Sequence, residues 1–492
     1  MGGRGKRFLN AGYNIYKPFL SISKNTTIVD NILDNFDTKK IKIIIIGNKK
    51  KIRKYKIKSK KKLEIIDIKN HSKGPLYSIF LAKEKIKEIV KNNNVFICYS
   101  DINWKWNFKK ISNFIKNKRS IVFTHNGYHP HLEVDQKSDF CLINKNNYIK
   151  SISEKKTHFS DYKNEHLAIG CYYFINFNLI TESLKKINFI SKQKKKEEFY
   201  LVSLIKILLN KKIKVFSKKI NKFVHLGNPA QYEDFLNWKK IANNSFEKSL
   251  NLKENNNVML MGGKGERMKG LSEKKPFLKI NNTKIFEYIF KKFGGKKNII
   301  ITNSKYFKHL NKTKYLVHKI KKTNSMFSTF ENSTPYLSSY KNFFLLSCDC
   351  FGTIRKNHFL QFLQKKKPEL VIFGYKFSNL QKNLFNSHTE LIIKNKNLVK
   401  INVKNNSNIS EIGHAGFFWI KNNEIFKHIN NFKIFFKKTI KNREILVDDY
   451  FSYILRNKLM KVNYYMLDQY IHIGSISEYY EFNYWKDYFN ED

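Results

Sequence analysis

The strongest constraint on the fold is that the chain contains the same series of stretches twice. It begins MGGRGKRFLNAGYNIYKPFLSI, and residues 260–280 read LMGGKGERMKGLSEKKPFLKI. Three more pairs follow in the same order: VFICYSDINW with FFLLSCDCFG, LAIGCYYFINFNLI with HAGFFWIKNNEIF, and KFVHLGNPAQYEDFLNW with QYIHIGSISEYYEFNYW. Their offset is nearly constant: 248 for Asp101 and Asp349, 246 for Gly170 and Gly416, and 247 for His225 and His472. A repeat of this length predicts a tandem duplication of one domain.

The length of the chain agrees with two domains. Its 492 residues exceed what one hydrophobic core usually holds. The polar stretch NNSFEKSLNLKENNN, residues 243–257, is typical of a linker. We therefore predict one domain over residues 1–246, a linker over 247–257 and a second domain over 258–492.

Within each half, strand-like apolar runs alternate with helical segments. The strand candidates are IKIIIIG, NVFICYS, SIVFTH, NIIITN and LVIFGYKF, and segments such as GPLYSIFLAKEKIKEIV lie between them. This alternation predicts an α/β domain with a mostly parallel, mixed sheet flanked by helices. Ligands of such sheets bind beyond the carboxyl ends of the strands.

Each half has a glycine-rich loop followed by Lys-Pro. Glycines let the backbone approach a ligand, and successive backbone N–H groups form a cradle for an anion. We expect the arginine to hold phosphate oxygens and the lysine to meet the α-phosphate or the leaving group. The residues of the two loops are Gly2, Gly3, Gly5, Arg7 and Lys17, and Gly262, Gly263, Gly265, Arg267 and Lys275.

The two loops differ in what precedes them. The strand-like NNVMLM leads into the second loop, whereas only Met1 precedes the glycines of the first. Such a strand is central in a sheet of this kind, and its loss exposes the edges of its neighbours. We therefore expect the first domain to lack its first strand, and Met1 to be internal to a longer chain.

The pattern G-G-x-G-x-R with K-P-F-L resembles the signature of the sugar-1-phosphate nucleotidyltransferases, and the first copy resembles the subgroup of capsule and surface-polysaccharide synthesis. The resemblance implies two tandem Rossmann-like nucleotidyltransferase domains. It implies a reaction between a nucleoside triphosphate (NTP) and a sugar-1-phosphate, giving a nucleotide-sugar and pyrophosphate, with Mg²⁺ as cofactor. The sequence names neither the sugar nor the base.

The resemblance also implies roles for single residues. Asp101 and Asp349, each after an apolar strand, match the aspartate that binds Mg²⁺. Gly74 with Ser78 in the first copy, and Asn324 in the second, match positions near the nucleotide base. Glu154 and Lys155, and Lys404 in the second copy, match positions at the sugar phosphate. Gly170 and Gly416 match positions beside the sugar.

The chain departs from that family at a second metal position. Many relatives have an aspartate where this chain has His225 and His472, and imidazole is a poor Mg²⁺ ligand. Asn228 or water is a possible substitute in the first copy. The second copy also has Val403 where glutamate is expected, and Glu444, Asp448 and Asp449 form an acidic cluster that could compensate. These departures put full activity in doubt, most of all in the second copy.

The composition argues against nucleic-acid binding, membrane insertion and secretion. The formal charge of +55 comes from 86 lysines and 8 arginines spread along the chain, which indicates compositional bias, and no nucleic-acid partner is expected. The chain has no apolar run long enough for a membrane span and no signal peptide, so we expect a cytoplasmic protein with reduced thiols. The two domains could pack as an intramolecular pseudo-dimer, or the protein could form homo-oligomers.

Two other readings stay open. One is a glycosyltransferase that consumes nucleotide-sugars, although such enzymes need a D-x-D motif that neither Asp101-Ile102-Asn103 nor Asp349-Cys350-Phe351 provides. The other is a second copy that binds a nucleotide-sugar without turnover.

Overall fold

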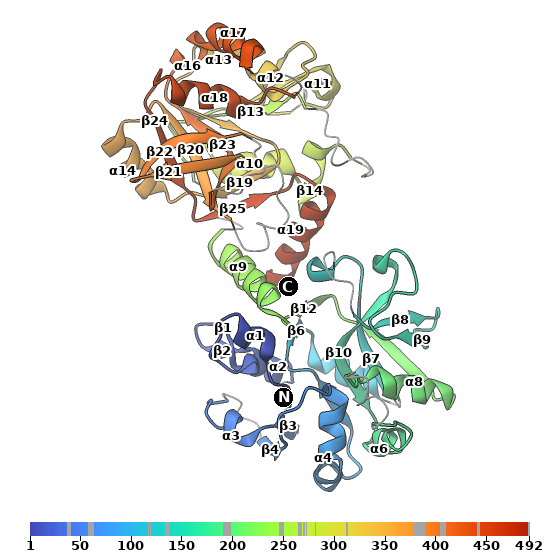
Figure 1. Ribbon diagram of the computed structural model, residues 1–492. Helices are drawn as coiled ribbons and strands as arrows, with labels where there is room; N and C mark the ends of the chain where they lie inside the picture. The colour runs from blue at the N-terminus through green and yellow to red at the C-terminus, as the bar shows by residue number, and fades with distance from the viewer. Residues whose placement is uncertain are drawn as a thin grey trace. The chain divides into compact units, whose positions relative to one another are not determined.

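The chain divides into two compact units, which Figure 1 shows in a computed structural model. The first consists of Met1–Lys239 with Tyr484–Asp492, and the second of Lys240–Asn483. The structure describes residues 1–36, 41–57, 63–116, 118, 120–132, 138–189, 198–245, 250–263, 268, 271, 273–280, 282–310, 313–377, 389–403, 410–439 and 443–490.

The first unit is a mixed α/β domain. Its strands are β1 (Ser21–Ser23), β2 (Thr26–Thr27), β3 (Ile43–Gly47), β4 (Leu63–Asp67), β5 (Val95–Cys98), β6 (Ile102–Lys105), β7 (Ser120–Asn126), β8 (Phe140–Ile143), β9 (Ile149–Ser153), β10 (His166–Phe174), β11 (Val215–Lys219) and β12 (Lys222–His225). Its helices are α1 (Lys6–Asn10), α2 (Ile28–Asp34), α3 (Lys49–Ile52), α4 (Pro75–Val90), α5 (Phe108–Ile115), α6 (Asn178–Leu184), α8 (Val202–Asn210) and α9 (Pro229–Ser245).

The main sheet of this unit has the order β11-β7-β10-β8-β9, with β5 also on β10. Strands β7 and β11 are parallel, whereas β10 runs antiparallel to β5, β7 and β8. Strands β3 and β4 form a separate parallel pair. Helices α4, α6 and α8 cover the sheet with a core that includes Leu76, Val122, Tyr172 and Ile205.

The second unit is also a mixed α/β domain. Its strands are β13 (Asn256–Met261), β14 (Lys279–Ile280), β15 (Thr283–Lys284), β16 (Asn298–Thr302), β17 (Leu316–Lys319), β18 (Phe343–Leu346), β19 (Cys350–Thr353), β20 (Leu370–Lys376), β21 (Glu390–Lys394), β22 (Asn397–Asn402), β23 (Ile412–Ile420), β24 (Val462–Met466) and β25 (Gln469–His472). Its helices are α10 (Ile285–Phe293), α11 (Ser304–Leu310), α12 (Met326–Asn332), α13 (Thr334–Leu337), α14 (Lys356–Lys366), α16 (Glu424–Lys427), α17 (Ile429–Thr439), α18 (Val447–Arg456) and α19 (Ile476–Phe489).

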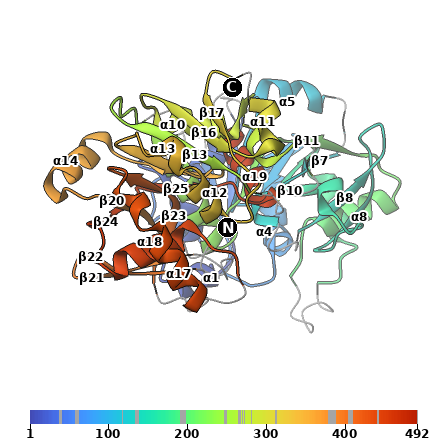
Figure 2. The ribbon, with the colours of Figure 1, turned by 90° about the horizontal axis from the view of Figure 1, so that it is seen from above.

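The sheet of the second unit has the order β17-β16-β13-β18-β23-β20-β24. Strand β13 is parallel to both β16 and β18, and β23 is antiparallel to β18 and β20. Consecutive residues of β23 face opposite sides of the sheet. Phe418 belongs to the core beneath α17 and α18, which Figure 2 shows side by side, and Phe417 contacts Phe293 of α10.

Local sequence explains where several helices begin. Thr27 and Asp30 form a capping box at the start of α2. Helix α4 begins with Gly74 and Pro75, a residue suited to the first helical turn because it needs no N–H partner. In α18 the carboxylate of Asp449 accepts a hydrogen bond from the backbone N–H of Leu446 at 2.9 Å.

The division between the units falls inside α9, at Lys239, and not at the polar stretch 247–257 that the sequence suggested. The reason is aromatic packing at the end of the chain. Trp485 stacks on Trp238 with ring centroids 6.1 Å apart and also contacts Phe235. Leu250 and Leu252, in the suggested linker, are buried in the second unit, and β13 begins at Asn256.

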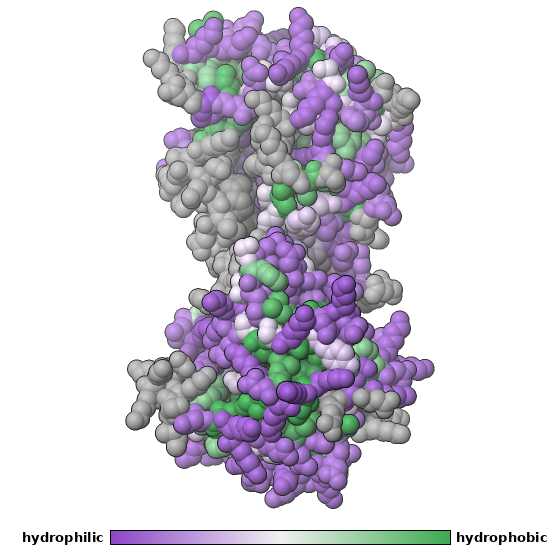
Figure 3. Space-filling view, turned by 90° about the vertical axis from the view of Figure 1, so that its right-hand side faces the viewer, coloured by the Kyte–Doolittle hydropathy of each residue, from purple (hydrophilic) through white to green (hydrophobic). Residues whose placement is uncertain are grey.

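Three general expectations can be compared with the structure. Hydrophilic residues are spread over both units on the face drawn in Figure 3, which agrees with a dispersed charge. All five cysteines are free. Among the described residues, no helix is long and apolar enough to span a membrane.

Candidate active site

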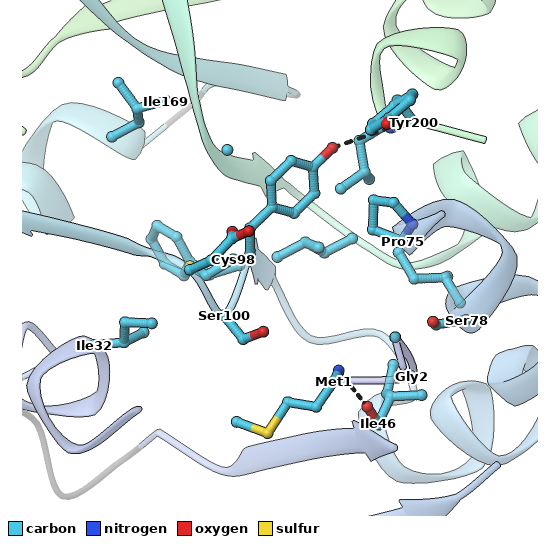
Figure 4. Close-up of a pocket in the computed structure, with 18 of the residues that line it drawn as sticks. Met1, Gly2, Ile32, Ile46, Pro75, Ser78, Cys98, Ser100, Ile169 and Tyr200 are labelled. Carbon is cyan, nitrogen blue, oxygen red and sulfur yellow. Dashed lines mark hydrogen bonds between the residues drawn. The ribbon is translucent and has the colours of Figure 1, made fainter. Parts of the chain in front are cut away.

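The first unit contains a cavity of about 1370 Å³ at the carboxyl end of β5. Its walls come from the amino-terminal loop, the start of α4, the end of β5, the middle of β10 and the turn after β12. Figure 4 shows Met1, Gly2, Pro75, Ser78 and Ser100 around it. The predicted site residues that line it are Gly2, Gly3, Gly5, Arg7, Lys17, Gly74, Asp101, Lys155 and Gly170, whereas Glu154 does not.

The glycine loop is shaped by close backbone contacts. A Cβ atom on Gly2 would lie 2.6 Å from the hydroxyl of Ser78 and 2.8 Å from the ring of His71. Gly3 forms a parallel bridge with His71. Gly5 has φ = +67° and precedes α1, a conformation that favours glycine. The loop therefore needs glycine at Gly2 for space and at Gly5 for its dihedral angle.

The start of α4 faces the same cavity. Gly74 has φ = +80°, and a Cβ atom there would lie 2.5 Å from the carbonyl oxygen of Phe199. The hydroxyl of Ser78 and the Nε2 atom of His71 are 2.9 Å apart. The amino terminus of this helix of 16 residues attracts an anion through its partial positive charge, although Pro75 has no N–H and the N–H of Leu76 donates to the carbonyl oxygen of Phe199 at 3.0 Å. This wall therefore suits phosphate groups.

Lys17 and Asp101, predicted from separate motifs, are in direct contact. The Nζ atom of Lys17 donates to Oδ2 of Asp101 at 2.8 Å and to the carbonyl oxygen of Gly227 at 3.0 Å. Burial of Asp101 opposes its ionised form, but the charge of Lys17 and a smaller contribution from His225 lower the pKa of Asp101 to about 2. The pair therefore presents an ionised carboxylate and an ammonium group at one point of the cavity.

The opposite wall holds residues that the sequence reasoning missed. The Nζ atom of Lys155 lies over the ring of Tyr200, 4.4 Å from its centroid, and 4.0 Å from a carboxylate oxygen of Glu198. Its backbone N–H donates to Asp139 at 3.2 Å. Burial raises the pKa of Asp139 to about 6. Asp139, Glu198 and Tyr200 lie outside the four repeated stretches, so no pattern in the sequence pointed to them.

Gly170 lies where β10 bulges against β7, between Ala168 and Tyr172. Its φ is +84°, and a Cβ atom there would lie 2.6 Å from the ring of Tyr99. Gly416 occupies the corresponding bulge of β23 and has φ = +74°. A Cβ atom there would lie 2.9 Å from the sulfur of Cys350. Both glycines are therefore needed by the strand itself, in addition to any role beside a ligand.

The second unit contains a matching lysine–aspartate pair. The Nζ atom of Lys275 donates to Oδ2 of Asp349 at 2.5 Å, and the carbonyl oxygen of Gly474 lies 3.5 Å from the same nitrogen. The Nε2 atom of His472 is 3.7 Å from Asp349, and its Nδ1 atom is 2.8 Å from Glu478. Burial opposes the charged imidazole, but the nearby carboxylates of Asp349 and Glu478 outweigh it and raise the pKa of His472 to about 9.

His225 differs from His472 in its charge. Burial, the largest influence, lowers the pKa of His225, although Asp101 opposes that shift. Where the second unit has Glu478, the first has Gln231, which accepts a hydrogen bond from the backbone N–H of Gly227 at 2.9 Å. His225 is therefore a neutral imidazole at pH 7, and His472 is a cation.

The other predicted residues of the second unit are placed only in part. Gly262 packs against Thr329 and Thr323, and Asn324 is exposed just before α12. Among the described residues, no atom lies within 4 Å of a Cβ placed on Gly263. Gly265, Arg267 and Lys404 lie outside the described residues.

The acidic cluster proposed as compensation has structural partners. Asp449 forms two hydrogen bonds with the guanidinium of Arg443, and Asp448 accepts one from Thr389 at 2.9 Å. Asp448 also lies 3.1 Å from a ring nitrogen of His414. Glu444 is exposed. These carboxylates thus stabilise the start of α18.

A magnesium ion fits the first unit only in a limited way. No group of three or more histidine, cysteine, aspartate and glutamate side chains that could hold a metal occurs in the described part of the chain. Mg²⁺, however, usually keeps several waters and binds one or two carboxylates together with substrate phosphates. The ionised Asp101, which lines the same cavity as the start of α4, offers one such carboxylate.

A comparison with protein families gives one match in this region. The family model described as nucleotidyl transferase matches residues 1–236, just under half of the chain. The match covers the glycine loop, Lys17, Asp101 and the whole cavity wall. It supports nucleotidyl transfer as the activity of the first unit.

Solved structures with some similarity include the inositol-1-phosphate CTP transferase from T. maritima, at 14% identity, 48% coverage of this chain, 97% of that chain and a TM-score of 0.38. A putative glucose-1-phosphate thymidylyltransferase from Bacillus anthracis has 12% identity, covers 48% and 97%, and has a TM-score of 0.37. A nucleoside-diphosphate-sugar pyrophosphorylase from Vibrio cholerae has 12% identity, 46% and 99% coverage, and a TM-score of 0.36. TM-scores this low support no conclusion about this chain. No curated protein matches it.

Proposed function

We propose that the first unit transfers a nucleotidyl group from an NTP to a sugar-1-phosphate. The observation that carries this proposal is the contact of Lys17 with Asp101, inside a cavity walled by the glycine loop and the start of α4. Two polyanions must meet in such a reaction, and this cavity combines the positive end of the α4 dipole with Arg7 and Lys17.

The reaction needs no covalent intermediate on the protein. A phosphate oxygen of the sugar-1-phosphate attacks the α-phosphorus of the NTP, and a new P–O bond forms. The bond from that phosphorus to the oxygen bridging the β-phosphate breaks, and pyrophosphate leaves with its electron pair. Catalysis then consists of positioning and charge neutralisation. Arg7 and Lys17 are the cations that line the cavity beside the glycine loop.

Asp101 is the residue that would hold Mg²⁺. The ion would neutralise phosphate charge on the substrates. On the opposite wall, Lys155 is the cation for the sugar phosphate, with Tyr200 beneath its ammonium group. The use of the product in surface-polysaccharide synthesis rests on the sequence resemblance alone.

We also propose that the second unit is a duplicate of the first that binds a nucleotide-sugar without turnover. The corresponding strand orders and the repeated lysine–aspartate pair support the duplication. The charged His472 supports the loss of turnover, because both His472 and Lys275 form ion pairs with the carboxylate of Asp349. A metal ion would have to displace two cations there.

The test is pyrophosphate release with Mg²⁺ across a panel of NTPs and sugar-1-phosphates, for the intact chain and for two matched variants. We expect Asp101→Asn to abolish turnover, since Asp101 would hold a metal ion that stabilises the transition state by several kcal/mol, and Asp349→Asn to leave turnover within about twofold. No turnover on any pair overturns the proposal for the first unit. Equal losses in both variants overturn the proposal for the second.

A further inference from the structure

The cavity wall that carries Lys155 is assembled from three separate segments of the first unit. Asp139 directly precedes β8, Lys155 follows β9, and Glu198 and Tyr200 precede α8. All four residues line the cavity, and Figure 4 shows Tyr200 on the side of it away from Met1. The contacts between these segments therefore fix where the ammonium group of Lys155 lies.

The backbone of Lys155 has an uncommon conformation. Its φ is +52°, in the left-handed region that costs a non-glycine residue free energy unless its surroundings hold it there. The backbone N–H of Lys155 donates to Oδ1 of Asp139 at 3.2 Å. Just beyond, the hydroxyl of Ser153 donates to the carbonyl oxygen of Lys156 and closes the turn on its other side. The carboxylate of Asp139 thus holds the N–H side of this strained turn.

Asp139 is itself fixed to the main sheet. Its carbonyl oxygen accepts a hydrogen bond from the N–H of Ala168 in β10 at 2.8 Å, at the start of the bulge that contains Gly170. Burial raises the pKa of Asp139 to about 6, and the hydrogen bond from the N–H of Lys155 opposes this shift. The carboxylate is therefore ionised at pH 7, and a charged acceptor makes the stronger hydrogen bond.

The other end of Lys155 is held as well. Its Nζ atom lies 4.4 Å from the centroid of the Tyr200 ring and 4.0 Å from a carboxylate oxygen of Glu198. The hydroxyl of Tyr200 donates to Glu198, so the two residues form one contact surface for the ammonium group. A change in the φ of Lys155 would redirect its Cα–Cβ bond and move the ammonium group away from this surface.

The second unit differs at the position of Asp139. Thr389 precedes β21 as Asp139 precedes β8. The N–H of His414 donates to the carbonyl oxygen of Thr389 at 2.9 Å, as that of Ala168 does to Asp139. The hydroxyl of Thr389, however, donates to Asp448 at 2.9 Å. Where the first unit has a carboxylate that accepts from a lysine backbone, the second has a hydroxyl that donates to the start of α18.

We propose that Asp139 is a positioning residue for the second substrate. By holding the backbone of Lys155, it places the Lys155 ammonium group where the phosphate of the sugar-1-phosphate binds. This inference rests on the proposed function, in which Lys155 is the cation for that phosphate. Because Asp139 acts through Lys155, it affects the affinity for the sugar-1-phosphate and leaves that for the NTP unchanged.

The functional test is a double-mutant cycle of Asp139→Ala and Lys155→Ala, with kcat and both KM values measured on the NTP and sugar-1-phosphate pair of highest turnover. We expect Asp139→Ala to raise the KM for the sugar-1-phosphate by about tenfold, with kcat and the KM for the NTP within about twofold. The double variant should match Lys155→Ala alone, because two changes in one contact do not add. Additive losses, or an equal rise in the KM for the NTP, overturn the proposal.

Two further variants separate positioning from a general loss of structure. Asp139→Asn keeps an oxygen that accepts from the N–H of Lys155, so its KM for the sugar-1-phosphate should stay within about threefold of that of the native chain. The matched variant Thr389→Ala should leave both KM values unchanged. The proposal is wrong if Asp139→Asn loses as much affinity as Asp139→Ala, or if Thr389→Ala has the same effect.

A second measurement does not require turnover. Acetic anhydride acetylates lysines in their uncharged form, and tandem mass spectrometry gives the rate at each lysine of the intact chain. We expect Lys155 to react about threefold faster in Asp139→Ala than in the native chain, because the ammonium group leaves the carboxylate of Glu198 that favours its charged form. Equal rates overturn the proposal. If the native chain releases no pyrophosphate on any pair, the proposed function fails, and the rate at Lys155 still shows whether Asp139 positions it.

Discussion

The lysine–aspartate pairs of the two units have nearly the same geometry and different electrostatics. In both, the lysine binds the aspartate and lies beside the carbonyl oxygen of a glycine, Gly227 or Gly474. The histidine that follows is neutral in the first unit, where burial lowers the pKa of His225. In the second unit the pKa of His472 is raised to about 9.

Besides the neighbouring aspartate, one residue six positions further along the chain contributes to this difference. Glu478 accepts from His472 and from the N–H groups of Gly474 and Ser475, whereas Gln231 is uncharged. A carboxylate next to a buried imidazole favours its charged form. A duplicated site can therefore keep its shape while the charge available to a metal or a phosphate changes.

The largest expected effect is the difference in activity between replacing the lysine of the first unit and replacing that of the second. Lys17→Ala removes the ammonium group beside Asp101, and we expect kcat/KM for pyrophosphate release to fall by about 10²–10³. The matched variant Lys275→Ala should change it by less than about twofold. Steady-state kinetics on one NTP and sugar-1-phosphate pair measures both. If the two variants lose activity equally, the distinction between the units is wrong.

A second comparison concerns the glycines at the two bulges. Gly170→Ala places a Cβ atom 2.6 Å from the partly buried ring of Tyr99 at φ = +84°, and Gly416→Ala places one 2.9 Å from the sulfur of Cys350 at φ = +74°. A strained backbone costs about 1–3 kcal/mol, and the aromatic ring yields less than a thiol. We expect both variants to lower the melting temperature of their unit, Gly170→Ala by more.

The effect of Gly170→Ala should be on stability first. A stable variant with reduced affinity for the sugar phosphate would show that Gly170 acts mainly beside the ligand. Calorimetry together with KM distinguishes the two results.

Much of the fold was predictable because the apolar runs are local signals. IKIIIIG, NVFICYS, NIIITN and LVIFGYKF contain β3, β5, β16 and β20, and SIVFTH covers β7 except for Asn126. A mixed α/β architecture is confirmed, although most pairings in the main sheet of the first unit are antiparallel. The division inside α9 was not predictable, since it depends on Trp485 packing against Trp238 across more than 200 residues of chain.

The candidate site was predictable where a motif is repeated. Lys17 and Asp101 come from two repeated stretches, and the structure brings them into contact. Asp139 and Tyr200 reach the cavity through packing of the strands and loops that carry them, which no spacing in the sequence encodes. The charge of His472 was also missed, because it requires knowing that Glu478 folds back onto the ring.

The smallest expected effect comes from exchanging the two residues that contact the histidine rings or their neighbours, Glu478 and Gln231. Glu478→Gln removes a hydrogen-bonded carboxylate, so the pKa of His472 should fall from about 9, and Gln231→Glu should raise the pKa of His225. NMR titration of the ring protons measures both shifts. If neither histidine moves, Asp349 and Asp101 alone set the charges, and the exchange at these positions does not explain the difference between the units.

The same exchange has a consequence for stability against pH. Since the pKa of His472 is higher in the folded chain than the 6.5 of a free imidazole, its contribution to stability is fully present below pH 6.5 and is lost as the pH rises through about 9. Between these limits the native chain should lose more stability than the Glu478→Gln variant, whose His472 binds its proton less tightly. Urea unfolding of the second unit at pH 6 and pH 10 gives the difference. If the free energy of unfolding changes equally with pH in the two chains, Glu478 does not hold the proton on His472.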